Sequence, residues 1–366
     1  MNVHRHFAQS YTQARDKFVA AAGARSADLF RHVHPALHGV EGEDLSIDLA
    51  LLGKPDAASL LLLTSGTHGV EGFCGSGCQT ALLREDPFLR AIGHSDIAVL
   101  MLHALNPYGF SHLRRVNEDN IDLNRNFVDF GKPLPVNSAY AEIHSLLLPA
   151  TWPPTTESEA RLDAWVAQHG RAAYQAAVSI GQYAFHDGMF YGGSRPTWSN
   201  RTLRSVLREH VAGRRRLAWI DFHTGLGPRG HGEKIYAGLE NAGDIARTKA
   251  VWGREVTSVF DGSSSSARIG GNIGGAARDE CPDTEFCGIA LEYGTHDIEQ
   301  VLEALRVEHW FANHPEASRA HYKEMKRKFR DAFYVDDDDW KETVYTQALA
   351  ACLQAVEHLS RATAHA

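Results

Sequence analysis

The chain has 366 residues, of which 43% are hydrophobic and 22% are charged, and its formal net charge is −8. This composition is typical of a globular protein and excludes wholesale disorder, a collagen-like repeat and a disulfide-stapled miniprotein. A mildly acidic chain is a poor general binder of nucleic acid or of an anionic membrane, so we expect neither as a partner.

The five cysteines are sparse and odd in number, which does not indicate a disulfide framework. The spacings Cys74-x3-Cys78 and Cys281-x5-Cys287 differ from those of zinc knuckles, so small buried thiols are favoured over a metal site. The N-terminus has no apolar signal core, and no run of 18 apolar residues is present. A cytoplasmic location is therefore the default expectation.

The predicted elements alternate between apolar strands and helices along the chain. Residues 59–65 (SLLLLTS) form a continuous apolar run typical of a buried central strand, and Asn106-Pro107-Tyr108-Gly109 is a turn signal. The other predicted strands are 46–52, 96–103, 217–222 and 288–293. The predicted helices are 8–22, 72–85, 137–148, 157–180, 199–211, 297–312, 315–330 and 339–361.

This alternation predicts an α/β fold with a mixed, mostly parallel central sheet flanked by helices. No linker or repeat array is evident, so we expect one domain over 1–366, with an insertion at about 150–215 and C-terminal helices at about 297–361. Ligands of such sheets bind beyond the carboxyl ends of the strands, which is where candidate site residues are sought.

Two segments read as loops. Residues 183–198 are rich in glycine and aromatic residues, and residues 261–275 are rich in serine and glycine, which indicates mobility. We expect both segments to form the rim of a pocket and to restrict it to small substrates. For the first segment, the alternative is that its aromatic side chains belong to the core.

Four His-x-x-Glu spacings occur in the chain, at His38/Glu41, His68/Glu71, His296/Glu299 and His321/Glu324. Two zinc ligands can come from this spacing, but the spacing alone is weak evidence. Only His68 follows directly on a predicted buried strand, where Gly66 permits a sharp turn. We therefore favour His68 and Glu71 as metal ligands and regard the identical pentapeptide at 38–42 as coincidence.

A catalytic zinc usually has three protein ligands and one water. His223 ends the strand LAWIDF and is the best third ligand, although a lone histidine there is more often structural. Glu292 lies in the apolar strand GIALEY, where an unpaired carboxylate is costly. It is either a general base for water or one partner of a structural salt bridge.

Six motifs then follow one another as they do in the carboxypeptidase A-like zinc peptidases, a superfamily that the chain resembles. They are His68-Gly-Val-Glu71, Asn106-Pro-Tyr-Gly109, Arg115-Val-Asn117, Asp122-Leu-Asn-Arg-Asn-Phe127, Asp221-Phe-His223 and Leu291-Glu292. Together they cover about residues 60–127 and 217–293. The resemblance implies a zinc-carboxypeptidase-like (phosphorylase/hydrolase-like) fold and one zinc per chain.

The resemblance also implies roles for individual residues. His68, Glu71 and His223 correspond to the zinc ligands, and Asp122 to the acceptor that orients the His68 ring. Arg115 corresponds to the cation that stabilises the oxyanion, Asn124 and Arg125 to the pair that grips a substrate carboxylate, and Glu292 to the general base. From the residues alone, the basic segment 114–126 also reads as a solvated surface loop.

The chain departs from the sequence pattern of the carboxypeptidase A-like zinc peptidases in three places. Its first metal motif is His-Gly-Val-Glu rather than His-Ala/Ser-Arg-Glu, Asn-Pro-Asp-Gly has become Asn-Pro-Tyr-Gly, and residues 261–275 contain no counterpart of the peptidases' mobile-loop tyrosine. Tyr236 lies too far upstream to be assigned this role. The chain thus resembles an uncharacterised bacterial branch related to the aspartoacylase/succinylglutamate desuccinylase group.

The expected activity is a metallopeptidase-type, zinc-dependent hydrolysis of an amide bond next to a carboxylate, with a small peptide as substrate. An N-acyl amino acid deacylase is the alternative among enzymes, with an N-acyl amino acid as substrate. A non-catalytic binding protein is the alternative from another class; it should lack one of His68, Glu71, His223 and Glu292, and all four are present. A serine hydrolase is disfavoured because no Gly-x-Ser-x-Gly motif follows a strand.

Overall fold

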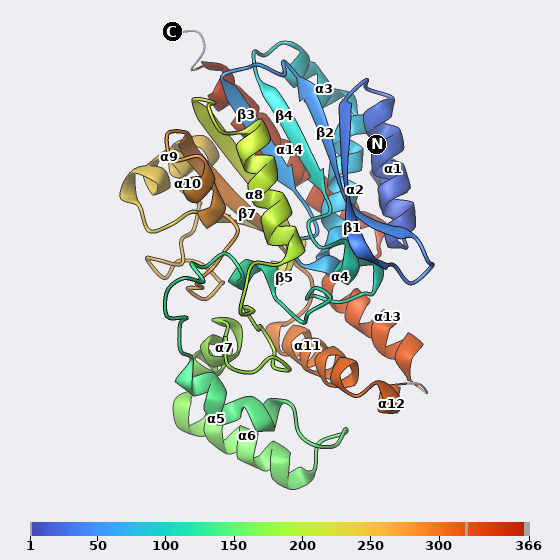
Figure 1. The fold of residues 1–366 in the computed structure, drawn as a ribbon, viewed down its shortest axis with the longest axis vertical. Helices are drawn as coiled ribbons and strands as arrows, with labels where there is room; N and C mark the ends of the chain where they lie inside the picture. Colours follow the sequence, from blue (N-terminus) through green and yellow to red (C-terminus); the bar gives the residue numbers. More distant parts are fainter. Residues whose placement is uncertain (1, 319–320, 362–366) are drawn as a thin grey trace.

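The computed structural model describes residues 2–318 and 321–361. Its centre is a seven-stranded sheet with the strand order β1-β2-β4-β3-β5-β7-β6 (Figure 1). The strands are β1 (Asp28–His38), β2 (Asp44–Gly53), β3 (Ser59–Thr64), β4 (Ala98–His103), β5 (Arg216–Arg229), β6 (Gly232–Tyr236) and β7 (Glu285–Gly294). The mixed α/β fold expected from the sequence is confirmed.

Helices lie on both faces of the sheet, with α8 in front and α14 behind it in Figure 1. The α-helices are α1 (Tyr11–Gly23), α2 (Gly72–Arg84), α3 (Asp86–Gly93), α4 (Pro107–Ser111), α5 (Ser138–Leu147), α6 (Thr156–His169), α7 (Arg171–Ser179), α8 (Trp198–His210), α9 (Ala242–Trp252), α10 (Gly275–Glu280), α11 (Ile298–Asn313), α12 (Pro315–Ser318), α13 (Tyr322–Phe333) and α14 (Asp338–Arg361). Short 3-10 helices are η1 (Val3–His6), η2 (Gly69–Glu71) and η3 (Leu123–Arg125).

The register of the parallel strands brings the candidate residues to one edge. β3 pairs in parallel with β4 and β5, and β5 pairs in parallel with β7. Thr64, the last residue of β3, is opposite Asp221 on β5, and His223 is opposite Glu292 on β7. The chain therefore leaves β3 for His68 at the level where β5 and β7 present their polar residues.

The core is apolar on both sides of this sheet. Leu60–Leu63 of β3 are completely buried, as expected for a central strand covered on both faces. One side of α14 is buried through residues such as Trp340, Val344 and Ala348. All five cysteines are free and buried, which confirms the interpretation as small apolar thiols. Within the described ranges, no helix combines the length and the apolar character needed to cross a membrane.

Several element predictions are corrected by the structure. The helix expected over 157–180 is divided into α6 and α7 at Gly170, whose positive φ of 89° ends α6. The segment expected as one helix over 315–330 contains α12 and α13, and residues 319–320 between them lie outside the described residues. The turn at 106–109 begins the short helix α4, because the Asn106 side chain accepts a hydrogen bond from the backbone N–H of Gly109.

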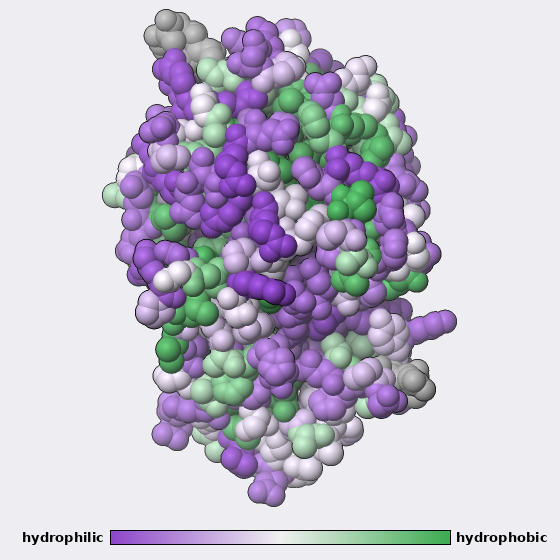
Figure 2. All heavy atoms as spheres, viewed as in Figure 1, coloured by the Kyte–Doolittle hydropathy of each residue, from purple (hydrophilic) through white to green (hydrophobic). Residues whose placement is uncertain are grey.

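The two edge strands, β1 and β6, were not predicted. β1 is mostly exposed, so its sequence carries no regular alternation of apolar and polar residues. Leu29, Phe30 and Val33 of this strand are exposed. Figure 2 shows hydrophobic residues gathered at the upper right of the molecule, where Figure 1 draws β1. β6 is only five residues long; it pairs with the strand β7, and a single bridge joins its Ile235 to Thr257.

Candidate active site

A sharp turn after β3 places the first candidate residues. Gly66 has a positive φ of 63°, and a Cβ at this position would lie 2.8 Å from the Cβ of Ala104. Glycine meets both requirements at once, because it has no Cβ and adopts positive φ without strain. The chain then reaches His68 and enters η2, which ends at Glu71.

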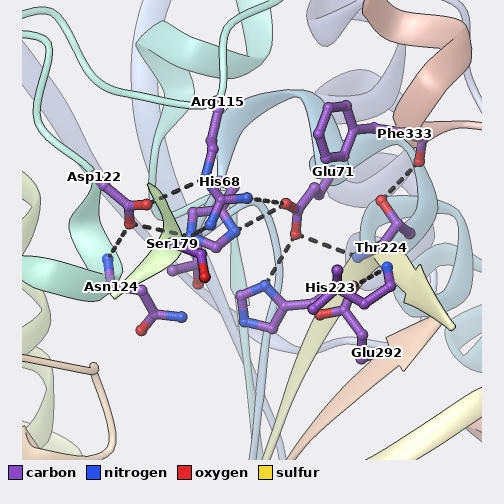
Figure 3. A network of polar contacts seen from close by, with 12 residues as sticks. His68, Glu71, Arg115, Asp122, Asn124, Ser179, His223, Thr224, Glu292 and Phe333 are labelled. Atoms are coloured by element: carbon purple, nitrogen blue, oxygen red, sulfur yellow. Dashed lines mark hydrogen bonds and ion pairs between the residues drawn. The ribbon is translucent and has the colours of Figure 1, made fainter. Parts of the chain in front are cut away.

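His68, Glu71 and His223 form a compact buried cluster (Figure 3). The Glu71 carboxylate lies between the two rings, with Oε1 2.9 Å from His68 Nδ1 and Oε2 2.9 Å from His223 Nδ1. One potential ligand atom from each residue lies within 4.8 Å of the others. Two imidazoles and one carboxylate are a donor set that catalytic zinc sites use, so the residues present fit a zinc ion.

The other three His-x-x-Glu pairs do not enter this cluster. The side chain of His38 is 66% exposed and faces Asp44, and His296 and His321 are exposed. No further group of three histidine, cysteine or acidic side chains that could hold a metal is found among residues 2–318 and 321–361. The structure therefore brings His68 and Glu71 into the cluster, the pair that was favoured because it follows a predicted buried strand.

Buried carboxylates and an arginine surround the two histidines. Asp122 Oδ1 lies 3.2 Å from His68 Nε2, and Arg115 donates to Asp122 and Glu71 at 3.1 and 2.9 Å. Burial by itself raises the pKa of Asp122, but Arg115 and Arg125 outweigh it and hold this pKa well below its usual range. Asp122 is therefore a charged acceptor beside the His68 ring.

His223 is held between two carboxylates. Its Nδ1 faces Glu71 and its Nε2 is in short contact with Asp221, two residues earlier on β5. Burial by itself lowers the pKa of His223, but Asp221 and Glu71 outweigh it and hold this pKa well above its usual range.

Glu292 lies on β7 beside His223 and borders the same cleft. Its Oε1 accepts a hydrogen bond of 3.0 Å from the backbone N–H of Leu226. Burial, and then the negative charge of Glu71, raise the pKa of Glu292 to about 7. A carboxyl group with this pKa can both accept and release a proton near neutral pH.

Asn124 and Arg125 reach the cleft from η3. Arg125 is 4% exposed and donates to the backbone oxygens of Asn124 and Ser179, whereas its buried Nε has no hydrogen-bond partner. The Phe190 ring lies under Arg115 and Arg125, at 5.0 and 5.5 Å from their guanidinium carbons. Phe190 comes from residues 183–198, the segment predicted to form the pocket rim. Ser179 was missed, because it lies in a segment without any recognisable motif.

Both predicted loops contribute to the wall of the cleft. Residues 183–198 supply Phe190, and residues 261–275 supply Ser266, Ile269 and Ile273 among others. Most aromatic side chains of the first loop serve other contacts; the Tyr183 hydroxyl, for example, donates to the Arg125 carbonyl oxygen. Tyr236 also lines the cleft, but its hydroxyl donates to the Leu239 carbonyl oxygen.

The second loop, residues 261–275, is anchored near its C-terminal end. Phe127 donates its backbone N–H to the Gly271 carbonyl oxygen at 3.0 Å, and Ile273 donates to Asn124 Oδ1 at 3.0 Å. Gly271 has a positive φ of 75°, and a Cβ there would lie 2.5 Å from the Arg125 carbonyl oxygen. The loop is thereby fastened to the segment that carries Asn124 and Arg125.

The fold is carboxypeptidase-like, as the order of the sequence motifs implied. Thrombin-activatable fibrinolysis inhibitor matches with 12% identity and a TM-score of 0.53 over 96% of this chain and 74% of that protein. The bovine inhibitor, in complex with tick carboxypeptidase inhibitor, matches with 11% identity and a TM-score of 0.51 over 97% of this chain and 98% of that one. Carboxypeptidase A from Helicoverpa armigera matches with 13% identity and a TM-score of 0.47 over 88% of this chain and 74% of that one.

Within this class of fold, the chain belongs to the family described as "Protein of unknown function (DUF2817)", whose model matches residues 7–347. No curated protein sequence matches the chain.

Proposed function

We propose that the chain is a zinc-dependent hydrolase that cleaves an amide bond next to a substrate carboxylate. The observation that carries this proposal is that one cleft is bordered by the His68–Glu71–His223 cluster, by Glu292 and by two arginines. His68, Glu71 and His223 would hold the zinc. When bound, zinc lowers the pKa of water and polarises a carbonyl oxygen.

The residues of the chain supply the remaining chemistry. Glu292 takes a proton from the attacking water and returns it to the leaving amine, because its pKa of about 7 suits both transfers. Arg115 borders the cleft next to Glu71 and stabilises the negative charge that develops on the carbonyl oxygen. Arg125 binds the substrate carboxylate, for which a planar guanidinium is well suited.

The lining of the cleft indicates which side chain fits beside this carboxylate. Apolar residues such as Ile235, Ile269, Ile273, Phe286 and Ile289 border the cleft, and its charged residues all belong to the set His68, Glu71, Arg115, Arg125, Asp221, His223 and Glu292. An uncharged, apolar side chain would bury apolar surface here without leaving a charge unpaired. We therefore propose small peptides that end in an apolar residue as first substrates, with N-acyl apolar amino acids as the alternative.

The test is a hydrolysis screen of the zinc-loaded protein. N-blocked dipeptides and N-acyl amino acids with leucine or phenylalanine at the carboxyl end are compared with the same compounds carrying a C-terminal amide, and with their lysine and aspartate counterparts. We expect hydrolysis of the apolar free acids and little of the amides. The preferred series separates carboxypeptidase from deacylase, and stoichiometric zinc binding without any hydrolysis would leave a binding protein.

A further inference from the structure

The surroundings of His223 assign a role to a residue outside the proposed catalytic set. We infer that Asp221 is a positioning residue that fixes the orientation and the tautomer of His223, so that Nδ1 is directed at the metal. This inference rests on the proposed function in one respect, namely that His223 is a metal ligand. Asp221 is 3% exposed and lies beneath the cluster, on the same strand as His223.

A chain of hydrogen bonds with a single possible direction leads to Asp221. The Trp219 indole can only donate, and its Nε1–H points at Thr64 Oγ1 at 2.8 Å. The Thr64 hydroxyl thus accepts from Trp219, and its own proton goes to Asp221 Oδ1 at 2.6 Å. The Thr67 hydroxyl lies between the two carboxylate oxygens, 3.0 Å from Oδ1 and 3.2 Å from Oδ2. Thr64 therefore fixes Oδ1 as its acceptor, and Oδ2 is the oxygen that faces the histidine.

The contact between Asp221 and His223 then fixes the ring. Asp221 Oδ2 is an acceptor, so the His223 Nε2 that faces it carries a hydrogen and donates. The opposite nitrogen, Nδ1, is the atom on the Glu71 side, 2.9 Å from Oε2. A metal-ligating histidine commonly donates its other ring N–H to a carboxylate, which sets the tautomer and the angle of the ring.

His68 differs from His223 in this respect. Its Nε2 faces Asp122 at 3.2 Å, but it also lies 2.8 Å from the Arg115 Nη2, a group that only donates. The ring of His68 therefore has both an acceptor and a donor at the same nitrogen. His223 has an acceptor alone, so it is the histidine that the protein orients without competition.

Asp221→Asn tests this assignment because its chemistry has a defined outcome. Thr64 keeps the amide oxygen at the Oδ1 position, since the reverse orientation would leave its buried hydroxyl proton unpaired. The amide NH₂ then faces His223 Nε2, which has to become an acceptor, and the ring hydrogen moves to Nδ1. We expect the zinc dissociation constant to rise by about 10- to 100-fold, the usual effect of losing such a partner.

The matched control is Asp48→Asn, which removes a buried carboxylate on β2 that is paired with Arg15. Zinc affinity is measured by competition with a chromophoric chelator, and circular dichroism checks the fold of each variant. The control is expected to keep the wild-type dissociation constant. An Asp221→Asn protein that is folded and binds zinc within about twofold of wild type would overturn the inference while leaving the proposed function intact.

A second measurement is made on the wild-type protein. Nitrogen-15 NMR of histidine-labelled, zinc-loaded wild-type protein reports which ring nitrogen carries the hydrogen. We expect His223, assigned by comparison with a His223→Gln sample, to carry it on Nε2. A hydrogen on Nδ1 would overturn the inference even if Asp221→Asn failed to fold. A wild-type protein that binds no zinc would defeat both the inference and the proposed function.

Discussion

Two neighbouring arginines enter two buried charge clusters of opposite character. Arg114 donates to Glu308 on α11, and Lys326 on α13 donates to the same carboxylate oxygen at 2.6 Å. Arg115 instead enters the cluster of Glu71, Asp122 and the two histidines. The first cluster surrounds a single carboxylate, Glu308, with two cations. The second contains four carboxylates and two arginines; its members besides the histidines are Glu71, Asp122, Asp221, Glu292, Arg115 and Arg125.

The pKa values follow this difference. Burial by itself raises the pKa of Glu308, but Arg114 and Lys326 outweigh it and lower this pKa to about 2. Among the described residues, the hydrogen-bond donor to Glu292 is a single backbone N–H, that of Leu226, and burial and the charge of Glu71 raise the pKa of Glu292 to about 7. A buried charge that is fully paired is a structural element, whereas a displaced pKa in a cleft marks a candidate for proton transfer. The following experiments test this contrast.

The largest expected effect is the loss of the metal. His68→Ala removes a buried ring nitrogen from the proposed ligand set, and we expect stoichiometric zinc binding to disappear. His38→Ala changes an exposed ring in the identical pentapeptide and should retain one zinc per chain. Elemental analysis of the purified proteins measures both. Zinc lost from the His38 variant alone would place the site at the other pentapeptide.

Glu292→Gln should separate catalysis from structure. The amide cannot accept the proton of the attacking water, so we expect turnover to fall by about 10²- to 10⁴-fold. Zinc content and thermal stability should remain close to wild type. Turnover is measured on the best substrate of the screen at saturating concentration. Near-wild-type turnover would show that Glu292 is structural.

Glu308→Gln should have the complementary effect. Removing this carboxylate leaves Arg114 and Lys326 buried without their counter-charge, and we expect the free energy of unfolding to fall by about 3–5 kcal/mol. Glu299→Gln, on the same helix, breaks an exposed pair with Arg171 and should cost less than about 1 kcal/mol. Denaturant unfolding measures both. Equal losses of unfolding free energy in the two variants would show that the buried Glu308 cluster is no more important for stability than an exposed ion pair.

Arg125→Ala should lower kcat/KM for a free-acid substrate. The loss corresponds to about 2–5 kcal/mol of transition-state stabilisation, because the buried substrate carboxylate loses its partner. Amidating the substrate removes the same interaction from the other side. The two changes combined should cost little more than either alone. A double-mutant cycle on kcat/KM measures the coupling, and fully additive losses would show that Arg125 does not contact the carboxylate.

At acid pH, the difference in the free energy of unfolding between the wild type and Glu308→Gln should become smaller. The pKa of Glu308 in the folded protein, about 2, lies below the unfolded value of about 4.3. Its contribution, about 3 kcal/mol, is therefore complete above about pH 5 and decreases as pH falls towards 2. Denaturant unfolding of both proteins should show a smaller difference in the free energy of unfolding at pH 3 than at pH 7. A constant gap would refute the lowered pKa.

The parts of the fold that the sequence predicts are those with dense local signals. The continuous apolar runs that became β3, β4, β5 and β7 reveal the buried strands, and the motif at their carboxyl ends reveals His68, Glu71 and His223. Asp221 was also within reach of sequence reasoning. Alternate residues of a strand point to the same side, so the spacing Asp221-x-His223 already placed the carboxylate beside the ring.

The remaining features depend on contacts that no local pattern encodes. Phe190 lies under two arginines that are 65 or more positions earlier in the chain, and it has a positive φ of 52°. β1 is an edge strand that contains Pro35 and has little buried surface, so neither strand propensity nor alternation marks it. The division of the 157–180 segment at Gly170 follows from a backbone conformation that a helical pattern does not show.

The attachment of the 261–275 loop at Gly271 and Ile273 has a consequence for how this family diverges. Positions 271 and 273 are constrained by contacts to Arg125, Phe127 and Asn124. Ser266 and Ala267 border the cleft without such constraints, in the part of the loop before the attachment. Mutations there can alter which side chains are accepted while the carboxylate anchor keeps its geometry. Selection for a new substrate should therefore leave positions 266 and 267 variable beside a fixed Gly271.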